Sequence, residues 1–104
     1  MKSEKHKQIA KKNDLFRTTF FPFLGKLIFT DSVASDPNRE RIITAVREFN
    51  TFNEDNDPHG EHDFGRFTVE GEKFFWKIDY YDSNYEFFQE DGNRVLTIMR
   101  AEEY

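Results

Sequence analysis

The longest run of alternating aromatic and β-branched positions in the chain extends from Phe74 to Asp82. Read with a period of two, one side of this run carries Phe74, Trp76, Ile78 and Tyr80. The other side carries Phe75, Lys77, Asp79 and Tyr81. A strand with one buried face and one mixed face has this pattern. We therefore predict that a central strand occupies residues 74–82, with Trp76 pointing into the core.

Three more segments have the composition of strands, namely 26–31, 64–69 and 94–101. Glu70-Gly71 separates the second of them from the central strand and is a signal of a tight hairpin. Segment 85–90 precedes Asp91-Gly92, another hairpin signal, and is expected either to extend the sheet or to lie across its edge. The strands should form an antiparallel sheet of about four members.

Two segments have helical spacing. Ser3 can cap a helix that runs to about Phe16, with Ile9 on its apolar stripe. Asn13 lies on or beside that stripe, and we expect its side chain to bond to the backbone of a neighbouring loop. Asp36-Pro37 favours the start of a second helix because aspartate caps free amides and proline fits the first turn.

The second helix should run to about Asn50. Its predicted core side chains are Ile42, Ile43, Val46 and Phe49. The two helices together can cover one face of the sheet. The predicted fold class is therefore α+β, with an antiparallel sheet of about four strands and two helices packed on one face, in a single domain of residues 1–104.

Composition narrows the classes of function. The 104 residues include thirteen Phe, four Tyr and one Trp, whose rings can close a core in a short chain. The absence of cysteine removes thiolate catalysis and cysteine-ligated zinc from consideration. No segment is typical of a signal peptide or a membrane span, so we expect a cytoplasmic protein without a membrane partner.

Charge is unevenly distributed along the chain. Residues 1–13 carry five lysines and one glutamate, a net +4, while the whole chain carries −5. Residues 1–8 are interpreted as a basic arm that can fray. Because its lysines have no interleaved aromatic residues, they are typical of a solvated helix face, and nucleic acid is not an expected partner.

A polar loop between Thr51 and Asp63 is the main candidate for chemistry. It contains Glu54, Asp55, Asp57, His59, Glu61, His62 and Asp63. Its Asp55-x-Asp57 spacing suggests a calcium loop, but Arg66 stands where that loop needs a glutamate. Two imidazoles and several carboxylates could also hold zinc or another transition metal. The spacing of the histidines matches no established helical metal signature.

Acid–base chemistry is a further interpretation of the same loop, with His59 or His62 as the proton carrier and Asp63 or Asp79 orienting it. The interpretation that we favour is structural, with Pro58 and Gly60 forming turns and the polar side chains bonding to loop amides. We predict no cofactor and no metal.

The outward face of the sheet is the second candidate. The strand pattern places Phe75, Tyr81, Val95 and Met99 there, around Lys77, Asp79 and Thr97. A contiguous apolar surface of this kind is seldom left bare in a soluble protein. We therefore expect this face to pack against a second copy or a protein partner, with Lys77 and Asp79 paired in its middle.

Several strings in the chain resemble those of a known family. They are Asn56-Asp57-Pro58-His59-Gly60-Glu61-His62-Asp63-Phe64-Gly65, Trp76-Lys77-Ile78-Asp79-Tyr80-Tyr81-Asp82, Arg94-Val95-Leu96-Thr97-Ile98-Met99 and the closing Glu103-Tyr104, with Asn13-Asp14 and Arg17 near the start. In these strings the chain is similar to a family of small bacterial proteins known only as a domain of unknown function. The resemblance implies an accessory role, as cargo of chromosomes and mobile elements.

Three functional hypotheses follow. The preferred one is a non-enzymatic interaction module, acting as a homodimer through the outward face and the acidic loop. Its candidate binding residues are Asp57, His59, Glu61, His62, Asp63, Phe75, Lys77, Asp79 and Tyr81. The alternative is a small metal-binding or acid–base hydrolase-like enzyme that uses the loop histidines, without an assigned catalytic residue. The weaker alternative is an acidic inhibitor of a nucleic-acid-binding enzyme.

Overall fold

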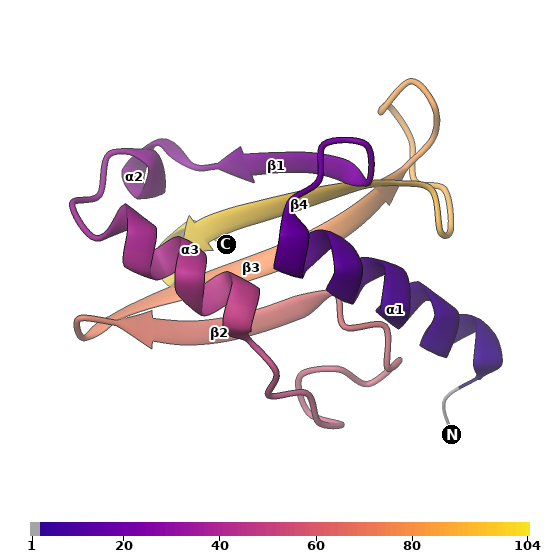
Figure 1. Cartoon of the computed structure of the whole chain (residues 1–104), viewed down its shortest axis with the longest axis horizontal. Helices are drawn as coiled ribbons and strands as arrows, with labels where there is room; N and C mark the ends of the chain where they lie inside the picture. Colours follow the sequence, from indigo (N-terminus) through magenta and orange to yellow (C-terminus); the bar gives the residue numbers. More distant parts are fainter. Residues whose placement is uncertain (1–2) are drawn as a thin grey trace.

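The computed structural model describes residues 3–104, and Met1 and Lys2 of the predicted basic arm lie outside the described residues. The first half of the chain forms α1 (Glu4–Thr19), β1 (Gly25–Phe29), α2 (Asp31–Ala34) and α3 (Arg39–Glu48). The second half forms β2 (Phe64–Val69), β3 (Glu72–Tyr81), β4 (Asn93–Arg100) and the short 3₁₀ helix η1 (Ala101–Glu103) (Figure 1). The chain therefore mixes helices with one sheet, in agreement with an α+β class.

The four strands have the order β1-β4-β3-β2. Strand β3 pairs antiparallel with both β2 and β4, but β1 runs parallel to β4. The prediction of a purely antiparallel sheet was therefore wrong at β1. The chain leaves β1 through two helices instead of a hairpin, so β1 can lie beside the last strand in the same direction.

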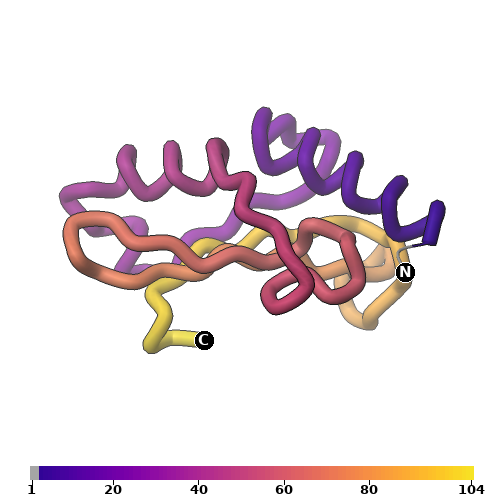
Figure 2. The backbone as a smooth tube through the Cα atoms, turned by 90° about the horizontal axis from the view of Figure 1, so that it is seen from below, coloured from indigo at the N-terminus to yellow at the C-terminus, as the bar shows by residue number. Residues whose placement is uncertain are grey.

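Helices α1 and α3 lie on one side of the sheet (Figure 2). Ile9 and Phe16 of α1 are buried in the same cluster as Ile42 and Val46 of α3. The sheet contributes the predicted inward row of β3, in which Phe74, Trp76, Ile78 and Tyr80 are all buried. Alternation along β3 thus places its aromatic rings against the apolar faces of the helices.

Several element boundaries differ from the predicted ones. Helix α1 is capped by Ser3, whose side chain accepts a bond from the backbone N–H of His6, and it continues to Thr19. Residues 4–8 of the predicted basic arm belong to this helix. Strand β1 ends at Phe29, because the unpredicted helix α2 begins at Asp31.

The second predicted helix begins later than expected. Asp36-Pro37 forms a turn, in which Asp36 Oδ1 accepts a bond of 2.7 Å from the Asn38 N–H, and α3 begins at Arg39. The other oxygen of Asp36 binds Arg100 at the end of β4.

The expected strand at 85–90 reduces to a single bridge between Tyr81 and Phe88. The hairpin at Glu70-Gly71 is confirmed, since both residues have positive φ, as a type I′ turn requires.

Gly65 of β2 makes a close contact in the core. A Cβ at this position would lie 2.4 Å from Nε1 of Trp76 and 2.7 Å from Cζ of Phe49. We expect Gly65→Ala to lower the free energy of unfolding by about 1–3 kcal/mol, since the rings have to shift to admit a methyl group. Urea denaturation measures this change. Thr68→Ala, on the exposed side of the same strand, is the control, and its free energy of unfolding should stay within about 0.5 kcal/mol of the parent's. An equal loss of free energy in both variants would contradict the close packing at Gly65.

Candidate functional site

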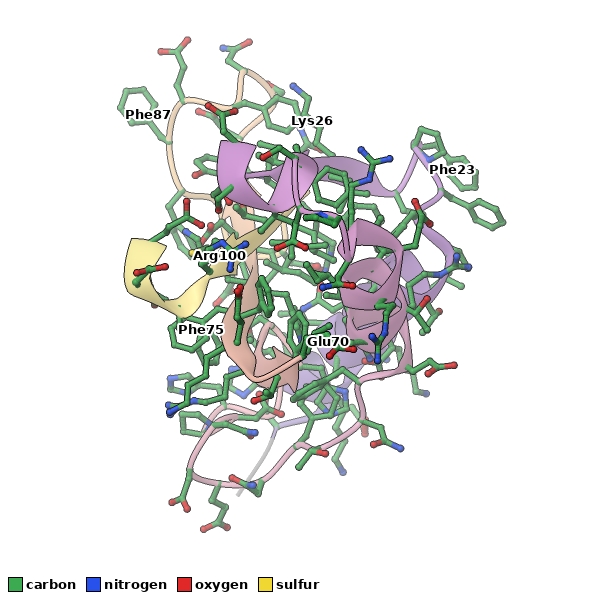
Figure 3. All side chains as sticks on the ribbon, turned by 90° about the vertical axis from the view of Figure 1, so that its left-hand side faces the viewer. Phe23, Lys26, Glu70, Phe75, Phe87 and Arg100 are labelled. Carbon is green, nitrogen blue, oxygen red and sulfur yellow. The ribbon has the colours of Figure 1, made fainter. Side chains whose placement is uncertain are left out.

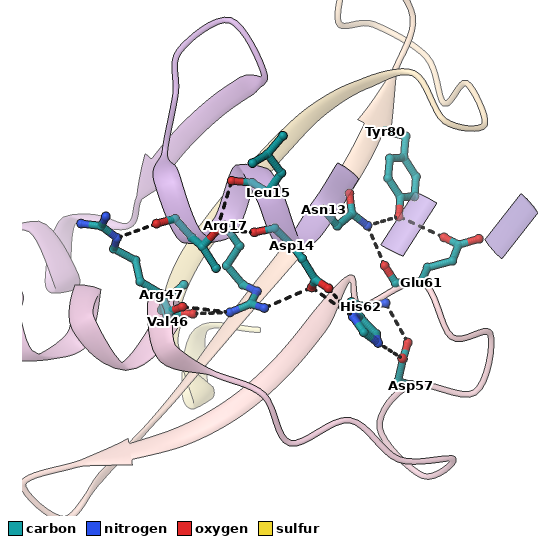
Figure 4. A network of polar contacts seen from close by, with 11 residues as sticks. Asn13, Asp14, Leu15, Arg17, Val46, Arg47, Asp57, Glu61, His62 and Tyr80 are labelled. Atoms are coloured by element: carbon teal, nitrogen blue, oxygen red, sulfur yellow. Dashed lines mark hydrogen bonds and ion pairs between the residues drawn. The ribbon is translucent and has the colours of Figure 1, made fainter. Parts of the chain in front are cut away.

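Helix α1 directs three polar side chains toward the loop that joins α3 to β2. Asn13 is completely buried and Arg17 is 3% exposed, while Asp14 lies between them at the surface of the helix (Figure 4). Unpaired buried polar groups cost free energy, so the partners of these side chains define how the loop can run.

The Asn13 amide joins three parts of the chain. Its Nδ2 donates to the Glu61 carbonyl oxygen at 2.9 Å and to the Tyr80 hydroxyl at 2.8 Å. Its Oδ1 accepts a bond from Nε of Arg94. The predicted bond from Asn13 to a loop backbone is therefore confirmed, and the same side chain also holds β3 and β4.

Tyr80 extends this network to the loop. Its hydroxyl donates to Oε1 of Glu61 at 3.0 Å. Burial raises the pKa of the Tyr80 hydroxyl far above its usual range, so this group stays protonated and acts as a donor. The second carboxylate oxygen of Glu61 lies 3.5 Å from Nε2 of His6 in α1.

Arg17 binds the end of α3. Its NH1 donates to the carbonyl oxygens of Val46 at 2.8 Å and of Arg47 at 3.3 Å, in the last turn of that helix. Its guanidinium lies 5.1 Å from the ring centroid of Trp76 and 5.6 Å from that of Phe52. Burial lowers the pKa of Arg17, and its contact with Asp14 opposes that shift.

His62 is enclosed by two carboxylates and a ring. Its Nδ1 lies 2.9 Å from Oδ2 of Asp14, and its Nε2 lies 3.7 Å from Oδ2 of Asp57. Its imidazole stacks on Phe52 with 3.9 Å between ring centroids and 5° between planes. The backbone of His62 has a φ of 55°, and its N–H donates to Oδ1 of Asp57. Asp57 is itself 1% exposed.

This geometry favours a structural role for the histidine. Proton transfer to a substrate needs one ring nitrogen directed at that substrate. Both nitrogens of His62 face carboxylates of the same chain. The carboxylate nearest the ring is Asp14, and not Asp63 or Asp79 as predicted. We define Asn13, Asp14, Arg17, Asp57 and His62 as the clasp, because they join α1 to the loop.

The remaining loop candidates lie apart from the clasp. His59 is exposed, with its ring centroid 5.9 Å from that of His6. Asp63 lines a cavity of about 260 Å³ together with Asp79, Tyr81 and Phe88. Within residues 3–104, no group of three His, Cys, Asp or Glu side chains is arranged to hold a metal ion.

The sequence prediction included Asp57 and His62 of the clasp and the bond from Asn13 to the loop, but it missed Asp14 and Arg17. Asp57, Glu61 and His62 were expected to be site residues, and the structure brings them together. Asp14, Arg17 and Tyr80 were not, although Asp14 and Arg17 stand in one of the strings that resemble the family. The signal that could have nominated them is the presence of Asn13 and Arg17 near an apolar helix stripe, since such residues need partners when buried.

Residues 29–103, well over half of the chain, match the family described as protein of unknown function DUF3768. The chain belongs to this family. No curated protein and no solved structure matches it. In this DUF3768 member the matched region includes Asp57, Glu61 and His62, whereas the α1 half of the clasp precedes it.

The outward face of this DUF3768 protein is only partly bare. Val95 and Met99 are 7% and 5% exposed, so the chain itself already covers them, contrary to the expected open apolar surface. Near one end, Tyr104 packs against Phe75 with 5.2 Å between ring centroids. In the middle, Nζ of Lys77 lies 2.8 Å from Oδ2 of Asp79, which is the predicted pair.

Large apolar side chains remain exposed at both ends of this face. Phe87 and Phe88 are 69% and 72% exposed, and Tyr104 is 71% exposed. Figure 2 shows the 83–92 loop and the C-terminal residues on the side of the sheet opposite the helices. Phe87 and Phe75 lie toward this side in Figure 3, whereas Phe23 lies on the other. No helix among the described residues has the length and apolarity to cross a membrane.

Asn13→Leu tests the clasp. The leucine is similar in size but leaves the Glu61 carbonyl, the Tyr80 hydroxyl and Arg94 without their Asn13 partner. We expect the free energy of unfolding to fall by about 3 kcal/mol, because buried groups then lose bonds without regaining water. Guanidinium denaturation measures the loss. Lys11→Leu on the exposed surface of α1 is the control, and a similar small change in both variants would show that the network is dispensable.

Asp63 gives a pH-dependent prediction. Burial, reinforced by the negative charges of Glu61 and Asp57, raises the pKa of Asp63 from 3.8 to about 6. The folded state therefore holds this proton more tightly than the unfolded chain, so the contribution of Asp63 to stability is lost as pH rises from about 4 to about 6. Asp63→Asn should raise the melting temperature by a few degrees at pH 7.5 relative to the parent.

The same substitution should have a much smaller effect at pH 4, where the parent carboxyl is already neutral in the folded protein. Thermal melts at the two pH values measure the difference. The exposed loop residue Asp55 provides the control as Asp55→Asn. An equal effect of Asp63→Asn at both pH values would refute the assigned cause.

Proposed function

We propose that this protein is a non-enzymatic interaction module of the bacterial cytoplasm, with an accessory role, and that it pairs with a second copy through the outward face of its sheet. The observation that carries the proposal is the exposure of Phe87, Phe88 and Tyr104 at the two ends of that face. Aromatic residues are enriched at protein interfaces, so exposed rings at the margins of this face favour a partner there.

The centre of the face supports a symmetric partner. In a two-fold dimer, residue i of one protomer contacts residue j of the other, and j contacts i. The Lys77–Asp79 pair suits this arrangement because each lysine can also reach the aspartate of the second protomer. The hydrogen bond to Asp79 raises the pKa of Lys77, so its positive charge is retained.

The loop residues have a supporting role in this proposal. The clasp engages Asp57 and His62 within the chain, which argues against the acid–base and metal alternatives. Glu54 and Asp55 remain exposed at the tip of the loop, where they can contribute to the rim of an interface. The aromatic residues supply the buried area.

A charge-exchange cycle tests the homodimer. We expect the parent to sediment as a dimer at micromolar concentration. Lys77→Asp should weaken dimerisation about tenfold, and Asp79→Lys should do the same, because each places like charges at the two-fold axis. The double variant should restore dimerisation, since it recreates two opposite-charge contacts. Sedimentation velocity across a dilution series measures all four proteins.

Lys7→Asp on the exposed surface of α1 is the matched control and should dimerise like the parent. Circular dichroism confirms that each variant is folded. A parent protein that remains monomeric at all concentrations would overturn the homodimer. A double variant no better than the single ones would refute the reciprocal contact.

A further inference from the structure

Strand β2 is a free edge of the sheet. It is the last strand in the order and pairs on one side only, with β3. The N–H of Ile78 donates to the carbonyl oxygen of Asp63, the residue before β2. Because inward and outward backbone groups alternate along an antiparallel strand, those of Gly65, Phe67 and Val69 point to β3. Those of Arg66 and Thr68 therefore point to the open edge.

A groove follows this edge where α3 crosses it. The cavity between α3 and the end of β2 has a volume of about 400 Å³, within the range of ligand sites in proteins. Ala45 and Thr44 line it on the helix side, and Thr68 and Val69 on the strand side. Small side chains on the helix leave room beside the strand for an extended backbone.

The walls of this groove are acidic. Glu40 and Glu48 of α3 and Glu70 of the hairpin line it, with Arg41 as the opposing cation. Arg41 is paired with Glu70, and its charge is thereby engaged within the chain. Glu40 is 84% exposed at its side chain and has only a long contact of 3.8 Å with Arg39. The groove therefore presents net negative charge beside unpaired backbone donors and acceptors.

We propose that an extended, lysine- or arginine-rich segment of a partner protein binds in this groove by adding a fifth strand along β2. The outward backbone groups of Thr68 and Arg66 supply main-chain hydrogen bonds, as in other cases of strand addition. Alternate side chains of the bound segment point to opposite faces. The basic ones lie on the helix side, where their aliphatic stems meet Ala45 and their charged ends reach Glu40 and Glu48.

The inference goes beyond the proposed homodimer and uses separate residues. The groove is lined by α3 and the β2 edge, whereas the dimer face is centred on Lys77 and Asp79. A protein with both surfaces would carry two partner segments on one dimer. Loss of one binding activity would leave the other intact, which separates the two proposals experimentally.

The test uses an eight-residue peptide of alternating lysine and valine, labelled with a fluorophore and titrated with the full-length protein. We expect saturable binding that weakens as salt rises, because the charged contacts are exposed. A glutamate–valine peptide should not bind. A lysine–valine peptide with methylated backbone nitrogens keeps its charge but loses its donors, and it should bind about tenfold more weakly.

Protein variants locate the site. The double variant Glu40→Lys and Glu48→Lys should lose about tenfold in affinity, since it reverses two charges of the groove. The control double variant Glu4→Lys and Glu86→Lys changes the net charge equally at exposed positions elsewhere, and it should bind like the parent. Amide NMR shifts should concentrate at Arg66 and Thr68, whose backbone groups point to the open edge.

Three results would overturn the proposal. The first is absence of binding by the lysine–valine peptide at millimolar concentration. The second is equal affinity for the methylated peptide, which would mean charge attraction without strand addition. The third is an equal loss in the two charge-reversal variants, which would mean attraction to net charge alone. Circular dichroism of each variant excludes unfolding as the cause.

Discussion

Burial of polar side chains from α1 beneath the loop before β2 is the constraint on which the rest of the structure depends. Asn13 and Arg17 are almost fully enclosed, and each unsatisfied buried donor costs about 1–3 kcal/mol. The loop therefore has to supply carbonyl oxygens and carboxylates at fixed points. Asp14 stands between Arg17 and His62 and couples the end of α3 to the loop. A segment without regular secondary structure is thereby held in one path.

The clasp also explains why the loop resembles a reactive site. Histidine with flanking carboxylates is the composition of many catalytic and metal centres. Here the His62 ring contacts Asp14 of the neighbouring helix, and Asp57 accepts a bond from the His62 N–H. These groups therefore hold the loop in place and are not directed at a substrate. Surfaces that remain available include the outward face of the sheet and the β2 edge. An acidic and aromatic chain can thus be rich in functional residue types and use few of them for function.

Local sequence features predicted local structure well. Alternation from Phe74 to Tyr80 identified the inward row of β3, and Ser3 and Glu70-Gly71 identified a helix cap and a hairpin. The predicted start of α3 was wrong because Asp36-Pro37 favours a turn as well as a helix start. Helix α2 was missed because four residues carry too little periodicity.

Long-range arrangement was not predictable in the same way. The contact between Asp14 and His62 joins residues 48 positions apart, and no local pattern pairs one aspartate with one histidine. The parallel pairing of β1 with β4 was missed for the same reason, because the composition of a strand does not determine which strand it pairs with. Of the candidate site, the sequence indicated the loop residues but not the helix residues that bind them. The direction of each side chain depended on those partners.

The position of β4 has a consequence for how the protein is made. This strand lies between β1 and β3 although it follows both in the sequence, so neither of them has its inner neighbour until residues 93–100 have been synthesised. Helix α1 and the β2–β3 hairpin can form early, but they have no common sheet to join. Assembly of the sheet must therefore wait for β4, and until then the facing edges of β1 and β3 have no partner strand.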